Sequence, residues 1–252
     1  MEHYTIVDNK EKKIISLDDF VSGNLDKVRR IVDSYGSRKA VFDGLDFEPK
    51  AYRESGKKKL LTYDKHEARL KKAGYDRAPT SQEAFGLIIA HLEGKLKKIN
   101  PVLDEVARDM LDSYGEFFCQ AVQRKGNKWI IFEKATGLKW DNSNDKYNIP
   151  RKKWYENKVV FDISGLAVGK WISLKEVDEK HPELIEYFYT RPFKGLPKHI
   201  GEVDMYIPND NNMWPVGRSI YSGAIDVRGC YSIRASRGMR KRQRRFTEKS
   251  RK

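Results

Sequence analysis

The sequence predicts an α+β fold: a mainly helical region, residues 1–114, packed against an antiparallel, strand-rich region, residues 115–234. A basic arm, residues 235–252, follows. Two observations predict this arrangement. Apolar residues recur at helical spacing between residues 62 and 114, whereas after Gly115 they fall in short β-branched and aromatic runs separated by turn residues.

Composition excludes several classes of protein. The chain has 252 residues, 39% hydrophobic and 34% charged, and a mean hydropathy of -0.74. Its longest apolar run is far shorter than the roughly 18 residues that a membrane span needs. The first residues lack the basic and apolar stretches of a secretory signal, and two cysteines make no disulfide framework. We therefore expect a protein of the cytoplasm or of a virion, neither secreted nor in a membrane.

The N-terminal region begins with a predicted hairpin over residues 4–15, because β-branched residues flank a turn-prone polar cluster. One or two short helices are expected over residues 17–35. Residues 41–59 are rich in Gly, Lys and Asp without a sustained period, which predicts a loop. A charged helix is expected over residues 66–73, ended by Gly74.

A helix pair over residues about 81–113 is the strongest structural prediction. Thr80 and Glu83 have the spacing of a capping box in front of an apolar helical face. Pro101 then opens a second amphipathic helix. Two sequential helices with a short link are expected to pack as an antiparallel pair.

The strand-rich region is expected to begin with a hairpin of residues 117–122 and 128–133, turning at Gly126 and Asn127. A helix is expected around residues 182–189. The other predicted strands are residues 159–163, the start of a mixed stretch at 171–174, 203–207 and 224–234. In the last of these, Arg228 and Arg234 share the polar face of an alternating pattern.

The net charge of +14 is concentrated in one segment. Only Ala235, Met239 and Phe246 are apolar in the basic arm, too few to offset the entropy of ordering it, so we expect it to be disordered on its own. Arginine predominates there, and guanidinium groups bind phosphate oxygens in pairs of hydrogen bonds. The ten cations after Ile233, accompanied by one acid, are Arg234, Arg237, Arg240, Lys241, Arg242, Arg244, Arg245, Lys249, Arg251 and Lys252.

A second candidate for nucleic-acid contact is the run Arg151, Lys152, Lys153 and Trp154, in which an aromatic ring directly follows the cations. Aromatic rings beside cations are typical of surfaces that stack bases. The other tryptophans, all in the strand-rich region, are more typical of a core or a subunit interface.

Two segments resemble a phosphate-binding loop and a calcium-binding loop but lack residues that these motifs require. Residues 165–170 have three residues between glycines where a phosphate-binding loop needs four, and Trp171 replaces the Ser or Thr. Asp141, Ser143 and Asp145 lack the glycine and the glutamate of a calcium loop and predict a polar turn. No cofactor, metal site or catalytic residue is predicted, and Cys119 and Cys230 are expected to be buried, inert thiols.

An enzyme alternative remains open. Asp162 with Asp178, Glu179 and Lys180 has the residue types of a metal-dependent nuclease, although the second group falls at a helix start. Around His181 and His199, acids make a second, weaker metal candidate.

Three functions follow from these observations. We favour a non-catalytic structural or binding subunit of a nucleic-acid-containing assembly, such as a virion or a ribonucleoprotein, that contacts RNA or DNA phosphates and other protein subunits. The alternative is a nuclease or another nucleic-acid-processing enzyme. The third is a regulatory protein whose arm binds an acidic protein partner.

Overall fold

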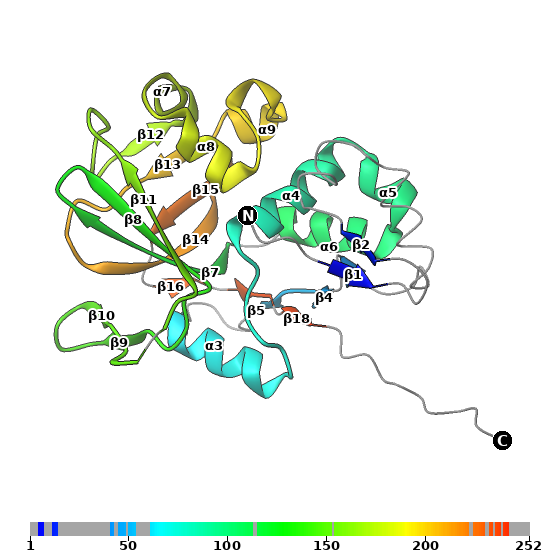
Figure 1. Ribbon diagram of the computed structural model, residues 1–252, viewed down its shortest axis with the longest axis horizontal. Helices are drawn as coiled ribbons and strands as arrows, with labels where there is room; N and C mark the ends of the chain where they lie inside the picture. Colours follow the sequence, from blue (N-terminus) through cyan, green and yellow to red (C-terminus); the bar gives the residue numbers. More distant parts are fainter. Residues whose placement is uncertain are drawn as a thin grey trace.

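The computed structural model describes residues 5–7, 12–14, 41–42, 45–48, 50–53, 61–112, 115–152, 154–221, 224–229, 232–233, 235–237 and 239–241. Helices and a mainly antiparallel sheet make up this part of the chain, so the α+β class is confirmed (Figure 1). The predicted division into a helical and a strand-rich half is not confirmed, since each half contributes both helices and strands.

The largest sheet is built around the predicted hairpin. Its strands β7 (Glu116–Lys125) and β8 (Lys128–Glu133) turn at Gly126, whose φ of 59° is the left-handed conformation that glycine adopts readily. From one edge to the other, the strand order is β11-β8-β7-β14-β15-β13-β12. The remaining strands of this path are β11 (Asn157–Asp162), β12 (Trp171–Ser173), β13 (Asp204–Tyr206), β14 (Met213–Tyr221) and β15 (Ala224–Gly229).

The central strand β14 is one that sequence patterning did not predict. Pro215 and Gly217 both argue against a central strand, because proline donates no ladder hydrogen bond and glycine weakens strands. The structure accommodates them with a shift of register between Pro215 and Gly217 where β14 pairs with β7. The irregularity is local, and β14 pairs without a break with β15 on its other side.

One face of this sheet is covered by helices. The helices α4 (Ser81–Leu92) and α6 (Pro101–Asp112) pack on each other, with the short α5 (Lys95–Ile99) between them in the chain. The predicted capping box forms, as Thr80 Oγ1 accepts from the Glu83 N–H and Glu83 accepts from the Thr80 N–H. Phe85 of α4 contacts Phe118 of β7 and Tyr189.

Three further α-helices and a 3-10 helix follow β12 (Figure 1). Leu184, Ile185 and Phe188 of α8 join the main apolar core with Trp129 of β8 and Ile172 of β12. These elements are α7 (Leu174–Lys180), α8 (Pro182–Tyr189), η1 (Phe193–Gly195) and α9 (Lys198–Gly201).

A second, smaller core lies on the other face of the sheet. Tyr63 of α3 (Tyr63–Lys72) packs there with Phe117, Phe132 and Tyr147. Tyr147 belongs to a hairpin of β9 (Lys139–Asp141) and β10 (Lys146–Asn148), whose polar turn is held by Asp141, as predicted. The sheet therefore lies between two layers, with α3 and this hairpin opposite α7 (Figure 1).

Short strands from the two ends of the chain pair with each other. The predicted loop at 41–59 is wrong in part, because β4 (Leu45–Phe47) pairs with β18 (Met239–Lys241), and β5 (Tyr52–Arg53) with β17 (Ala235–Ser236). These partners are about 190 residues away in the chain, so no local pattern reveals them. The remaining short strands are β1 (Thr5–Val7), β2 (Lys12–Ile14), β3 (Val41–Phe42), β6 (Leu61–Thr62) and β16 (Ser232–Ile233).

The same pairings correct two further predictions. The expected disorder of the basic arm is wrong for β17 and β18, which are ordered strands, while residues 242–252 lie outside the described residues. Residues 224–234 do not form one strand, since β15 ends at Gly229 and β16 pairs with β6 in a separate sheet. The hairpin over residues 4–15 forms as β1 and β2, whereas the helices expected over 17–35 lie outside the described residues.

Candidate functional site

The predicted nucleic-acid contacts do not share one environment. Arg151 and Lys152 are exposed after β10, where cations are free to meet a polyanion. Arg228 lies in β15, and Arg240 and Lys241 lie in β18. The remaining predicted contacts, which lie outside the described residues, are Lys153, Arg234, Arg242, Arg244, Arg245 and Arg251.

The prediction is wrong for Trp154. Its side chain is 8% exposed and packs on Phe132, with ring centroids 4.8 Å apart, and on Tyr155 at 5.1 Å. An indole in the smaller core cannot stack a base. The charged run Arg151–Lys153 favours an exposed ring, but Phe132 of β8, about 20 residues earlier, packs on it together with Tyr155.

The prediction is also wrong for Arg237, which is completely buried. Its guanidinium donates to the Glu48 carbonyl oxygen and pairs with Asp109 of α6 and with Glu116 of β7, the latter at 3.3 Å. Arg218 of β14 is equally buried and lies 3.6 Å from Glu116. Two acids more than 120 residues away thus engage Arg237, and it has no access to a phosphate.

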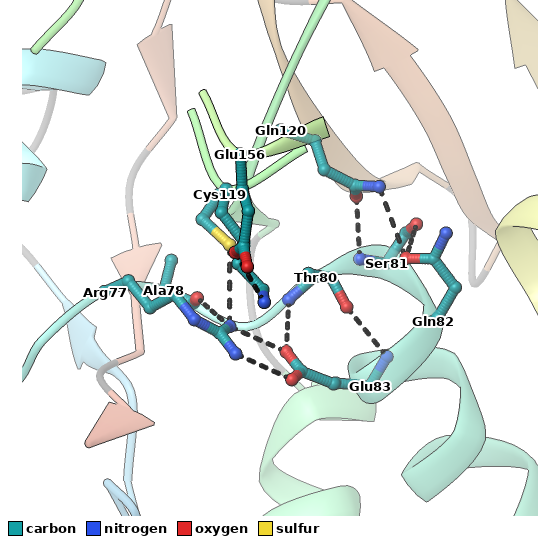
Figure 2. A network of polar contacts seen from close by, with 10 residues as sticks. Arg77, Ala78, Thr80, Ser81, Gln82, Glu83, Cys119, Gln120 and Glu156 are labelled. Atoms are coloured by element: carbon teal, nitrogen blue, oxygen red, sulfur yellow. Dashed lines mark hydrogen bonds and ion pairs between the residues drawn. The ribbon is translucent and has the colours of Figure 1, made fainter. Parts of the chain in front are cut away.

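A second polar cluster joins the start of α4 to β7 (Figure 2). Both terminal nitrogens of the Arg77 guanidinium group donate to the Glu83 carboxylate at 2.8 Å, and one of them lies 3.5 Å from the sulfur of Cys119. Burial by itself would raise the pKa of Glu83, but the charge and hydrogen bonds of Arg77 outweigh it and hold that pKa below its usual value. The ion pair holds the Glu83 carboxylate in place, and this carboxylate also accepts from the Thr80 N–H of the capping box.

Cys119 has the properties of an inert thiol. It is buried in β7, and burial raises the pKa of its thiol to about 11 despite the nearby Arg77 charge. A thiol with such a pKa carries almost no thiolate at neutral pH, and the thiolate is the nucleophile. The expectation for Cys119 is therefore confirmed, whereas Cys230 lies outside the described residues.

A small cavity lies beside this cluster, lined in part by Tyr63, His66, Asp76 and Arg77. The Tyr63 hydroxyl donates to the Ala135 carbonyl oxygen at 2.6 Å, and burial raises its pKa well above the usual value. The His66 ring packs against the Phe117 ring at 5.3 Å. These contacts hold α3 on the sheet, and Tyr63 stays neutral at physiological pH.

Three residues of the enzyme alternative, Asp162, Lys180 and His181, make local contacts. Asp162 accepts hydrogen bonds from the Ser164 N–H and hydroxyl, which lower its pKa. Lys180 donates to the Gly165 carbonyl oxygen and to Glu176, and His181 contacts the Ser164 carbonyl oxygen. Within the described ranges, no three His, Cys, Asp or Glu side chains gather closely enough to hold a metal ion.

The sheet exposes one aromatic side chain that sequence analysis assigned to a core or an interface. Trp171 of β12 is 45% exposed, and its ring packs on that of Tyr206 of β13 at 5.3 Å. Its neighbour Ile172 is buried in the main core. Because successive strand residues face opposite ways, the core position of Ile172 directs Trp171 outward. The alternation of Trp171, Ile172 and Ser173 is the signal that could have identified it.

Comparisons with protein-family models, curated proteins and solved structures find no match for this chain. Among the helices that the structure describes, none has the length and apolar character to cross a membrane.

Proposed function

We propose that this protein is a non-catalytic, nucleic-acid-binding subunit of a larger assembly, such as a virion or a ribonucleoprotein, and that its phosphate contacts come mainly from residues 242–252. The observation that carries this proposal is the concentration of charge. Six Lys and Arg residues and one acid occupy these positions, namely Arg242, Arg244, Arg245, Glu248, Lys249, Arg251 and Lys252.

The structure supports this proposal by showing which residues of the basic arm take part in the fold, namely Arg237 and residues 239–241. Arg237 serves the fold, and β18 anchors the chain up to Lys241 by pairing with β4. The cations after Lys241 therefore follow directly on a strand that is paired with β4. Exposed Arg151 and Lys152 supply further cations of the sign that a phosphate backbone requires.

The test compares the intact chain with a chain ending at Lys241, which retains β17 and β18. Binding of both to labelled single-stranded and duplex nucleic acid is measured over a salt series with divalent metal present, and the products are run on a gel. Each phosphate contact adds about 0.7 to the log–log salt slope on a single strand, so removing six cations lowers the slope by up to about four.

Intact nucleic acid with a steep, truncation-sensitive slope supports the proposal. Cleavage of the nucleic acid would replace it with the enzyme alternative. Failure of the intact chain to bind either form would mean that the segment has a protein partner.

A further inference from the structure

The outer edge of the large sheet carries an exposed tryptophan that packs on a half-buried tyrosine. Three large hydrophobic side chains are exposed in the described part of the chain, Ile149, Val160 and Trp171, and Trp171 is the aromatic one. Its ring lies at 54° to the ring of Tyr206, which is half-buried and supports it from the neighbouring strand. Because both residues belong to paired strands, the platform is held by backbone hydrogen bonds.

The charges around this pair are of mixed sign. Lys170 directly precedes Trp171 and is exposed. Lys175, at the start of α7, is also exposed. Arg228 occupies the register position beside Tyr206 on the next strand, β15. Asp204, also exposed, lies beside Ser173. Lys170 thus lies at the Trp171 end of β12, whereas Lys175 and Asp204 lie at its Ser173 end.

We infer that Trp171, supported by Tyr206, stacks a base of a single-stranded nucleic acid whose phosphates pass on the side of Lys170. This site deepens the proposed function and rests on it. An indole presents a large face that every base can stack on, and such stacking is insensitive to sequence. The charges fit this occupant, because Lys170 attracts the phosphates that accompany a stacked base and Asp204 repels them from the Ser173 end of the strand.

The inference selects single strands over duplexes. Bases in a duplex are stacked on each other, so their faces become available to an indole only after unstacking, which costs free energy. The edge strand β12 has β13 on one side and is the last strand of the described sheet order. A flexible strand can approach such an edge.

The test uses the full chain and two labelled probes of equal length, oligothymidylate and an abasic strand with the same phosphates. We expect the wild type to bind oligothymidylate about tenfold more tightly than the abasic strand, the advantage that stacking of one base confers. Trp171→Ala removes this preference without changing the salt slope, and Trp171→Phe retains most of it. The control is Val160→Ala, which trims an exposed side chain on the opposite edge strand β11 and leaves the preference intact.

Two results overturn the inference while the proposed function stands. The first is salt-dependent binding with no preference for bases. The second is a preference that survives in Trp171→Ala. If the wild type binds neither probe, the proposed function fails together with the inference. A change of oligomeric state in Trp171→Ala, with base preference unchanged, would assign the indole to a contact between protein chains and overturn the inference.

Discussion

At the scale of single residues, Glu116 is a charged side chain in the interior of the fold. Its carboxylate is fully buried and lies between the guanidinium groups of Arg218 and Arg237. Buried cations lose their hydration, and a paired carboxylate compensates for that loss only while it keeps its charge. The geometry therefore predicts that neutralising Glu116 is far more costly than neutralising a surface acid.

We expect Glu116→Gln to lower the free energy of unfolding by about 3 kcal/mol, since it leaves two buried guanidinium groups with less compensation. Urea denaturation followed by circular dichroism measures this loss. Glu105→Gln, the same change at an exposed position of α6, is the control and should stay within about 0.5 kcal/mol of the wild type. Equal stability of the two variants would contradict this assignment.

Cys119 makes stability depend on pH in a predictable direction. Burial raises the pKa of its thiol to about 11 in the folded protein, above its value in the unfolded chain. Above pH ~9 the unfolded chain releases this proton while the folded chain retains it, so stability falls as pH rises towards 11. We expect the wild type to lose about 2 kcal/mol more than Cys119→Ala between pH 8 and 11.

The measurement is a set of urea unfolding curves for both proteins across this pH range. Subtracting the two pH profiles removes the contribution of other titrating groups that the proteins share. If the two pH profiles are parallel, Cys119 contributes nothing to the loss of stability between pH 8 and 11.

At the scale of elements, α3 and α4 offer a matched pair of helix starts. Both have threonine at the N-cap, but only Thr80 of α4 accepts a hydrogen bond through its side chain, whereas Thr62 of α3 makes no such bond. A cap bond satisfies a backbone N–H that the helix itself leaves without a partner. The same substitution should therefore have different effects at the two positions.

We expect Thr80→Ala to destabilise the protein by about 1 kcal/mol, the usual contribution of an N-cap hydroxyl. Thr62→Ala should leave stability unchanged or raise it slightly, because the Thr62 hydroxyl is buried without a hydrogen bond. Thermal unfolding of both variants beside the wild type decides the matter. A larger loss at Thr62 than at Thr80 would be inconsistent with these cap geometries.

At the scale of the whole molecule, the chain segment of residues 232–241 closes the fold. It pairs with strands at residues 45–62, places Arg237 in the buried ion cluster and places Met239 in the main core. Met239 also exchanges backbone hydrogen bonds with Arg77. Contacts of such long sequence separation form one structural unit from the two ends of the chain.

We therefore expect a chain ending at Lys241 to keep the unfolding free energy of the intact protein within about 0.5 kcal/mol. A chain ending at Arg234 should lose about 5 kcal/mol or fail to fold, because it removes Arg237 and Met239 and leaves Glu116 with less compensation. Denaturant unfolding of the three chains measures this. Equal stability of the two truncated chains would contradict the closing role of residues 235–241.

The amino-acid sequence by itself determined the local elements of this protein. The capping box of Thr80 and Glu83, the hairpin around Gly126 and the polar turn at Asp141 all depend on residues within a few positions of each other. The residue types and their spacing in the sequence are therefore enough to predict these elements. The concentration of charge after Ile233 is likewise a property of composition.

Only the tertiary structure decided which of the candidate side chains reach solvent. Trp154 and Arg237 resemble surface contacts by their charged neighbours in the sequence, yet both are buried. Phe132 of another strand packs on Trp154, and acids more than 120 residues away pair with Arg237, while Trp171 is exposed at the sheet edge. Strand β14 formed despite Pro215 because β7 and β15 pair with it from both sides. The burial of Arg237 and the pairing of β14 with β7 depend on contacts between residues far apart in the chain, and for that reason no local pattern specified them.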